Sequence, residues 1–86
     1  GKPKGVLLTH ANLLANATSI NRWFGLDEHF TWMNVLPLFH VNGEVVTLMT
    51  PLVAGGAVVL NRKFSVSRFW STVRHYAVNG VSVVPT

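Results

Sequence analysis

The first five residues, Gly1-Lys2-Pro3-Lys4-Gly5, combine the residue types that suit a phosphate-binding turn. Glycine lets the backbone approach a ligand closely, and proline fixes one backbone dihedral angle. Lysine supplies a compact positive charge that attracts phosphate oxygens. We therefore expect a phosphate contact at this turn, although it lacks the Gly-Lys-Ser/Thr sequence that opens a helix in a Walker loop.

A second candidate, His40, lies in the loop Leu38 to Gly43, which follows the run Thr31 to Leu36. If that run is a strand of a parallel sheet, His40 lies beyond its carboxyl end, where such sheets bind ligands. A lone histidine after a strand is more often a structural residue. The residue types alone leave both interpretations open.

Composition limits the class of protein. Eighty-six residues form one small domain whose core would be marginal alone. Charged residues make up only 12% of the chain, about half the usual share, so we expect chain outside this sequence to cover much of its surface. There is no cysteine, and the four histidines show no short metal-ligand spacing, so neither a disulfide nor a metal site is predicted.

The formal net charge of +4 does not indicate a nucleic-acid partner. Nucleic-acid-binding domains concentrate their cations on one face with interleaved aromatic residues, whereas the later cations here are scattered. No signal-peptide pattern is present. The longest apolar stretch, Val45 to Leu60, is interrupted by Pro51 and falls short of the roughly 20 apolar residues of a spanning helix. We expect solvated surface positions for Arg22, Arg62, Lys63, Arg68 and Arg74.

Hydrophobic spacing and turn residues predict an alternation of strands and helices. Thr9 and Ser65 are suitable N-caps for two of the helices, and Gly25 is a suitable stop for the first. Strands are predicted over 6–9, 31–36, 57–60 and 81–84, and helices over 10–24, 44–53 and 66–79. This order predicts an α/β fold with a mainly parallel sheet and right-handed crossovers.

Three further expectations concern packing. The helix over 44–53 is apolar on nearly all sides, which is typical of a buried helix. The strand over 6–9 is expected to run antiparallel to the others, because it would then bring the first loop to the rim on which His40 lies. The tryptophans are expected in the core, at Trp23, Trp32 and Trp70.

The opening loop and the residues after it resemble the phosphate loop of the adenylate-forming (AMP-binding) superfamily. Of the family pattern, the second half, Gly-x-Pro-Lys-Gly, is present here, followed by Val6-Leu7-Leu8-Thr9-His10. The segment Leu36-Pro37-Leu38-Phe39-His40-Val41-Asn42-Gly43 resembles a second family motif at about the expected distance. The stretches Pro51 to Leu60, Phe64 to Phe69 and Val83 to Thr86 fit the family's later elements, so the resemblance covers the whole chain in order.

The resemblance implies that residues 1–86 are a part, cut at both ends, of the N-terminal domain of an acyl- or aryl-CoA synthetase. Such a ligase activates a carboxylic acid with ATP and Mg²⁺ as an acyl-adenylate, and then transfers the acyl group to a thiol, usually coenzyme A. The implied partners are these small molecules and the remainder of the chain, including a C-terminal lid domain. A cytoplasmic location is implied, with peripheral membrane contact left open. We expect the 86 residues alone to be inactive.

By resemblance, Gly1, Lys4 and Gly5 belong to the loop that holds the β- and γ-phosphates of ATP. The family's direct hydroxyl contacts come from Ser/Thr residues before Gly1. Lys4 matches a fixed lysine of the loop, for which a phosphate contact and a structural role are both open. Lys2 matches a variable position and is expected in solvent.

His40 matches the position that lines the carboxylate end of the acyl pocket in the family, and Asn42 and Gly43 would lie beside the acyl tunnel. Gly43 would leave space for the substrate, or would only permit the turn into the helix. Glu44 departs from the apolar or small residue usual there. As an acidic residue it suits a helix N-terminus, where the helix dipole favours negative charge. If its side chain faced the tunnel, it would argue against a plain fatty substrate.

The acyl group and the class of protein remain partly open on the sequence. The apolar character of residues 38–53 favours a fatty or aryl acid over a small polar one. An adenylation domain of a peptide synthetase and a non-catalytic interaction domain that reuses the fold are the alternatives. No catalytic residue and no metal ligand is assigned.

Overall fold

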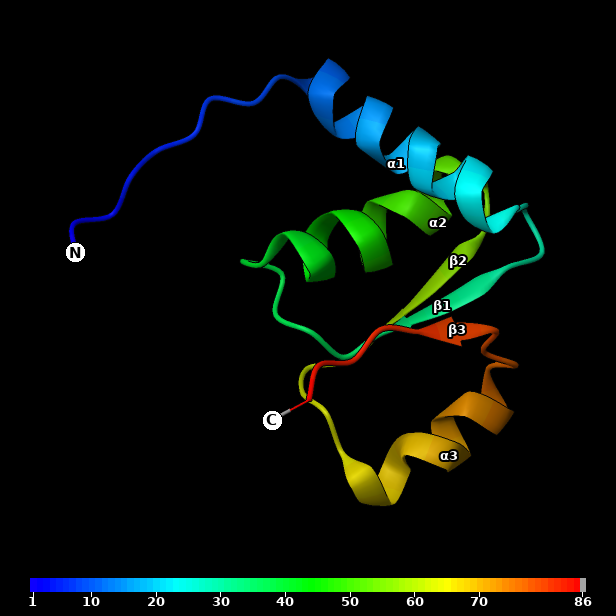
Figure 1. Cartoon of the computed structure of the whole chain (residues 1–86). Coiled ribbons are helices and arrows are strands. Elements are labelled where there is room, and N and C mark those ends of the chain that lie inside the picture. The colour runs from blue at the N-terminus through cyan, green and yellow to red at the C-terminus, as the bar shows by residue number, and fades with distance from the viewer. Residues whose placement is uncertain (86) are drawn as a thin grey trace.

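A three-stranded parallel sheet forms the centre of the computed structural model, which describes residues 1–85 (Figure 1). β1 lies in the middle, with Asn34 opposite Leu60 of one neighbour and Met33 opposite Val81 of the other. The strands are β1 (Thr31–Asn34), β2 (Ala57–Leu60) and β3 (Gly80–Val81), in the order β2-β1-β3. The predicted α/β fold with a mainly parallel sheet is confirmed.

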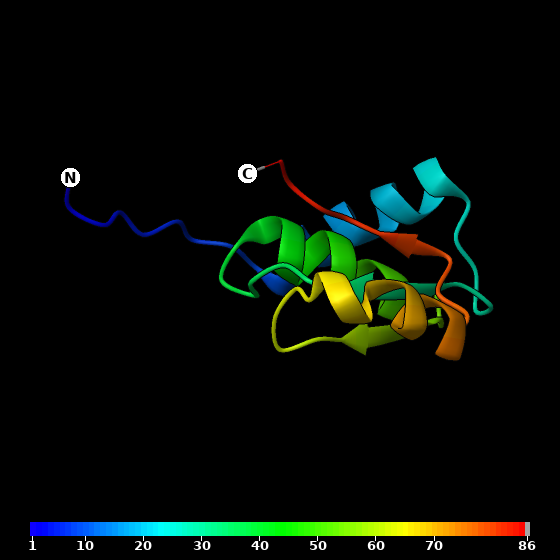
Figure 2. The ribbon, with the colours of Figure 1, turned by 90° about the horizontal axis from the view of Figure 1, so that it is seen from below.

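Helices cover both faces of the sheet (Figures 1 and 2). One face carries α1 (His10–Phe24), η1 (Asn42–Met49) and α2 (Thr50–Val53), which contact one another, and the other face carries α3 (Val66–His75). β2 and β3 lie on opposite sides of β1, so two crossovers of the usual right-handed kind place their helices on opposite faces.

The first helix begins and ends at the predicted residues. Thr9 has extended backbone, and its hydroxyl accepts a hydrogen bond from the Asn12 N–H at 3.0 Å, while Asn12 Oδ1 accepts one from the Thr9 N–H at 3.0 Å. Gly25 ends the helix in the left-handed conformation (φ 66°) that glycine adopts without strain. At α3, Ser65 also has extended backbone, but its hydroxyl pairs with that of Ser67 instead of capping the helix.

The predicted strand over 6–9 is wrong, and so is its predicted antiparallel direction. Residues 1–9 form an extended segment that leaves the body of the molecule, and Val6, Leu7 and Leu8 are exposed (Figure 1). A strand is stabilised by a neighbour that satisfies its N–H and C=O groups, and no strand within residues 1–85 pairs with this segment. The apolar pattern therefore did not predict the structure of this segment.

The first loop nevertheless lies near the rim expected for it. A short connector, residues 25–30, joins the end of α1 to the start of β1, so α1 runs back along the sheet. Its N-terminus and the segment 1–9 therefore lie on the side to which the three strands point (Figures 1 and 2).

The predicted helix over 44–53 consists of two consecutive helices. η1 is a π-helix, and Thr47 within it donates its hydroxyl hydrogen to the carbonyl oxygens of Gly43 (2.9 Å) and Asn42 (3.2 Å). The Thr50 hydroxyl donates to the Val45 carbonyl oxygen at 2.8 Å. The Val45 oxygen also accepts from the Thr50 N–H, so the hydroxyl adds a second hydrogen bond to the same carbonyl. Burial is partial: Gly43, Val45 and Thr47 of η1 are buried, whereas Leu52 and Val53 at the end of α2 are exposed.

The last helix and strand are both shorter than predicted. α3 ends at His75 instead of residue 79, and Ala77 has a left-handed φ of 51°. Asn79 then pairs with Thr31: its N–H donates to the Thr31 carbonyl at 2.8 Å, and its side-chain oxygen accepts from the Thr31 N–H at 2.7 Å. β3 follows as Gly80–Val81 in place of the predicted 81–84. Residues predicted as helix therefore fasten β3 to β1.

The core lies between β1 and the helices above it. Ala17, Met33 and Val45 are almost fully buried, and Trp32 is 7% exposed. Trp23 and Trp70, by contrast, are 84% and 64% exposed. Of the three predicted core tryptophans, only Trp32 lies in the core of the described residues.

The Thr9 cap gives a first testable prediction. Thr9→Ala removes the side-chain oxygen that satisfies a free N–H of the first turn, which destabilises a helix by about 1 kcal/mol. In a synthetic peptide of residues 6–26, we expect lower helix content by circular dichroism for Thr9→Ala and no loss for Thr9→Asp. Equal helix content in all three peptides would contradict a role for the cap.

Candidate functional site

The candidate site lies at the rim formed by the carboxyl ends of the strands. The segment from Val35 to Val41 follows β1 at this rim and leads into η1 (Figure 1). The turn after β2 starts at the same edge with Asn61, whose N–H donates to the Asn34 carbonyl at 3.1 Å. Parallel sheets bind ligands at this edge, because their loops and helix N-termini meet there.

His40 stands in an exposed part of this segment. Its ring packs against that of Phe39, with 4.6 Å between the centroids, and its side chain has no hydrogen-bond partner within residues 1–85. Only its backbone is tied down: the His40 N–H donates to Pro37 O at 3.3 Å, and its carbonyl accepts from the Glu44 N–H at 2.9 Å. The imidazole is therefore free to donate or accept a hydrogen bond at the rim.

Asn42 and Gly43 lie next to His40 and begin η1. Asn42 is half-buried, and its Oδ1 is buried with no hydrogen-bond partner among the described residues. Gly43 is buried, and a Cβ there would collide with the carbonyl group of Pro37. Close packing on Pro37 therefore requires glycine at 43. Its expected position beside an acyl tunnel stays a prediction.

Gly1, Lys4 and Gly5 lie apart from this cluster. They belong to the extended segment that precedes α1, and all three are exposed. A Cβ on Gly1 or Gly5 would meet no atom within 4 Å, so within residues 1–85 nothing packs against this backbone. The segment projects on the same side as the His40 loop, but the structure does not bring the two groups into contact (Figures 1 and 2).

Glu44 is the acidic residue in the first turn of η1, and its side chain is exposed. A carboxylate in the first turn interacts favourably with the unpaired N–H groups of a helix N-terminus. This position agrees with the interpretation of Glu44 as a helix N-terminal acid.

Two features of the rim were missed by the sequence analysis. The first is Asn34, the last residue of β1, which is fully buried and bonded to the loop that carries His40. An asparagine within an apolar run was the signal that could have identified it, because a buried amide must find partners.

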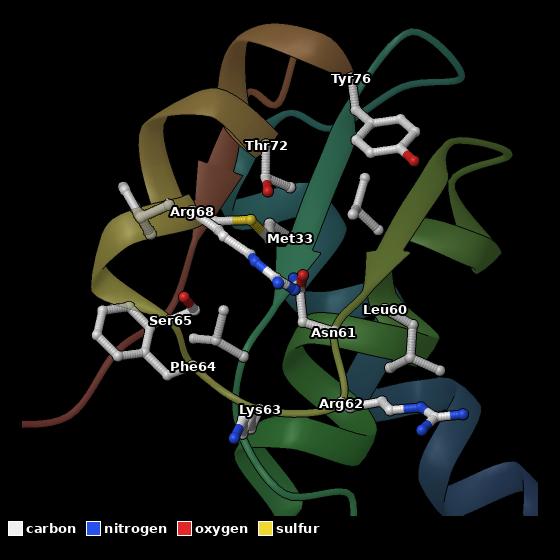
Figure 3. A pocket seen from close by; sticks show the side chains of 13 residues that line it. Met33, Leu60, Asn61, Arg62, Lys63, Phe64, Ser65, Arg68, Thr72 and Tyr76 are labelled. Atoms are coloured by element: carbon white, nitrogen blue, oxygen red, sulfur yellow. The ribbon is translucent and has the colours of Figure 1, made fainter.

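The second missed feature is a cavity of about 360 Å³ between α3, β2 and the turn that joins them (Figure 3). Arg62, Lys63 and Arg68 line it, and all three are exposed, as predicted for solvated cations. None of the three acidic residues of the chain, Asp27, Glu28 and Glu44, lines it. The absence of acids from the second half of the sequence was the available signal.

Two negative findings apply to the described residues. Within residues 1–85, no three His, Asp or Glu side chains are grouped so that they could hold a metal ion. None of the helices in that range combines the length and the apolar character that crossing a membrane requires.

Comparison with known families gives a match over the whole chain. The sequence model of the family described as AMP-binding enzyme matches residues 1–86. The chain is 46% identical over 86 residues to a sulfoacetate–CoA ligase of Cupriavidus necator, covering 100% of this chain and 17% of that protein. It is 39% identical over 87 residues to an oxalate–CoA ligase of Arabidopsis thaliana, covering 99% of this chain and 17% of that protein. The chain thus spans about a sixth of the length of these relatives.

A similar fold is found among solved structures. O-succinylbenzoate coenzyme A synthetase of Bacillus subtilis, in complex with ATP and magnesium ion, superposes with a TM-score of 0.85 and 36% sequence identity. The match covers 94% of this chain and 22% of that one. The α/β arrangement of sheet and helices is therefore one that an ATP-binding CoA synthetase contains.

The contact of Gly43 with Pro37 gives the second prediction. Gly43→Ala places a methyl group against the Pro37 carbonyl, and overpacking of this kind costs about 1–3 kcal/mol. We expect a lower melting temperature of the full-length protein, measured by differential scanning fluorimetry. Gly5→Ala is the matched control, because its methyl group meets no atom of residues 1–85 within 4 Å, and it should lower the melting temperature less than Gly43→Ala does. Equal melting temperatures for both variants would contradict the close packing at Gly43.

Proposed function

Since the chain belongs to the family of AMP-binding enzymes, we propose that it is part of an ATP-dependent ligase that joins a carboxylic acid to coenzyme A. The main support is the superposition of 94% of the chain on a CoA synthetase bound to ATP and magnesium ion. The two sequence relatives described above, which are named as CoA ligases, support the same reaction.

The proposed reaction has two steps. An oxygen of the acid attacks the α-phosphorus of ATP, the bond to the β-phosphate oxygen breaks, and pyrophosphate leaves with its electron pair. The thiolate of coenzyme A then attacks the acyl carbon, the carbon–oxygen bond breaks, and AMP leaves. Both steps bring anions together, so nearby cations and aligned hydrogen-bond donors lower the barrier.

In this proposal each predicted residue has one task. Lys4 neutralises phosphate charge, while Gly1 and Gly5 let the backbone approach the phosphates. His40 donates a hydrogen bond at the carboxylate end of the acid, a role supported by its exposed imidazole with a free hydrogen-bonding capacity. Asn42 and Gly43 border the acyl group, where the buried Asn42 Oδ1 has no hydrogen-bond partner within residues 1–85.

Mg²⁺ accompanies ATP in the similar solved structure. The described residues do not fit a metal site, because their three acidic side chains form no cluster. We therefore assign no Mg²⁺ ligand to this stretch and no step that depends on one.

The exposed apolar side chains support a location of this stretch inside a larger protein. Leu7, Phe39 and Trp70 are among many large apolar residues that residues 1–85 leave in solvent. Monomeric proteins rarely expose contiguous apolar patches of more than a few hundred Å². We propose that other parts of the N-terminal domain cover them, with a separate lid domain closing the rim; a cytoplasmic location stays a prediction.

The acid is proposed at the level of a class. The relatives' names specify sulfoacetate and oxalate, which are small acids with a second acidic group. The apolar residues 38–53 led us to predict a fatty or aryl acid. Both classes therefore belong in the substrate panel.

The third prediction tests the reaction itself. We expect the full-length protein to release pyrophosphate from ATP with at least one acid among sulfoacetate, oxalate, a fatty acid and an aryl acid, and to form the CoA thioester of that acid. The isolated 86 residues should give no ATP–pyrophosphate exchange above background. Failure of the full-length protein with every acid would overturn the ligase proposal, and exchange by the isolated chain would overturn its inactivity.

The fourth prediction compares the two lysines of the first loop in the full-length protein. Lys4→Ala should raise the KM for ATP about tenfold, since a charge-assisted contact contributes about 1.5–3 kcal/mol. Lys2→Ala is the control, because Lys2 is exposed and matches a variable position, and it should change KM by less than about twofold. Pyrophosphate-release kinetics measure both. Equal effects of the two substitutions would exclude a specific phosphate contact of Lys4.

A further inference from the structure

Asn34 connects the two ends of the loop that carries His40. It is the last residue of β1 and is fully buried. Its Nδ2 donates a hydrogen bond to the Gly43 carbonyl oxygen at 2.9 Å, and its Oδ1 accepts one from the Leu36 N–H at 2.9 Å. Leu36 lies at the start of the loop and Gly43 at its end, so the Asn34 side chain fixes the distance between the two ends of the loop.

The backbone of Asn34 adds a link to the next strand. Its carbonyl oxygen accepts a hydrogen bond from the Asn61 N–H at 3.1 Å, and Asn61 Nδ2 lies 3.4 Å from the same oxygen. Asn61 begins the turn after β2. Asn34 therefore holds the loop in a fixed relation to the carboxyl ends of both β1 and β2.

The two partners of the Asn34 side chain require an amide or a group that imitates one. The Leu36 N–H can only donate, and the Gly43 carbonyl can only accept, so the side chain must offer an acceptor and a donor together. An ionised carboxylate offers acceptors alone, and an aliphatic side chain offers neither. A protonated carboxyl group has nearly the shape of an amide and offers both.

The position of His40 depends on the two hydrogen bonds by which Asn34 joins the ends of the loop. Its ring has no hydrogen-bond partner within residues 1–85, and its backbone is bonded only to Pro37 and Glu44, which lie just inside and just beyond the two anchored ends. The direction of the imidazole is therefore set by the backbone of the loop, and the loop is fixed by Asn34.

We infer that Asn34 is a positioning residue for the acid substrate: by bridging Leu36 and Gly43, it holds His40 where it meets the carboxylate and Asn42 beside the acyl group. This inference rests on the proposed ligase function but concerns a fully buried residue that does not itself contact the acid. It acts on the acid-binding side of the site, because the segment of Lys4 has no contact with this loop.

The test compares three variants of the full-length protein. Asn34→Asp keeps the acceptor for Leu36 and loses the donor for Gly43 while it is ionised. Burial raises the pKa of a carboxyl group, so at lower pH the introduced group is protonated and regains the donor. Asn34→Leu loses both bonds at every pH. Thr50→Val is the matched control, since it removes a buried hydroxyl bond to Val45 within the helix and leaves the loop untouched.

We expect Asn34→Leu to raise the KM for the acid about tenfold, with the KM for ATP changed by less than about twofold. At pH 8, Asn34→Asp should also raise the KM for the acid about tenfold, relative to the unaltered protein at the same pH. At pH 6 this increase should fall to less than about threefold. Thr50→Val should lower the melting temperature without changing either KM.

Hydrogen–deuterium exchange gives a readout that does not require activity. After correction for the intrinsic effect of pH, peptides covering residues 35–43 should exchange faster in Asn34→Leu at both pH values and in Asn34→Asp chiefly at pH 8. Thr50→Val should not change them. Unchanged exchange in Asn34→Leu, or a defect in Asn34→Asp that does not vary with pH, would overturn the inference. Absence of activity in the unaltered protein would instead overturn the ligase proposal, with the exchange result still deciding the role of Asn34.

Discussion

The carboxyl end of β1 imposes the main constraint on this structure. The chain leaves the sheet there, as it does at the ends of β2 and β3, so the ladder of sheet hydrogen bonds stops. Backbone groups that lose a partner at such a point are costly when buried, so other groups must replace the missing bonds. Asn34 and Asn61 supply them between the strands, and the hydroxyl of Thr47 shares the Gly43 carbonyl with Asn34. The rim is thus held by a polar network, and Thr31 at the opposite end of β1 is held by its hydrogen bonds to Asn79; between these ends, Trp32 and Met33 pack in the apolar core.

Local rules were sufficient for the elements whose signals are local. The Thr9 cap, the Gly25 stop and the strand over 57–60 depend on a few neighbouring residues, and each was predicted where it lies. The π-helical form of η1 had no such signal. A helix that is apolar on nearly all sides has no clear polar face from which its period could be measured. Its hydroxyl-to-carbonyl bonds become visible only in three dimensions.

The failures share a different cause. The run Val6-Leu7-Leu8 and the side chains of Trp23 and Trp70 are apolar, and apolar residues were assigned to a strand or to the core. Apolarity predicts that a residue prefers a neighbour over water, but it does not specify the neighbour. In the described residues these side chains are exposed, and only Trp32, which lies on the central strand, has the predicted environment. Asn34 is the converse case, a polar residue whose burial follows from its place at the end of β1.

The same distinction bears on the choice of acid substrate. A fatty or aryl acid was favoured because residues 38–53 are apolar, yet Val45, one of these residues, is buried in the core of η1 and β1. Its apolar character is explained by packing and provides no information about a substrate. The polar side chains at the rim are His40, half-buried Asn42 and exposed Glu44, and the exposed apolar side chains Leu38, Phe39 and Val41 lie beside them. Two unit charges 4 Å apart interact by about 1 kcal/mol in water and by about 4 kcal/mol near a protein surface, so an acid with a second negative group requires Glu44 to point into solvent. Glu44 is exposed within the described residues, so its side chain has room to turn away from such a group.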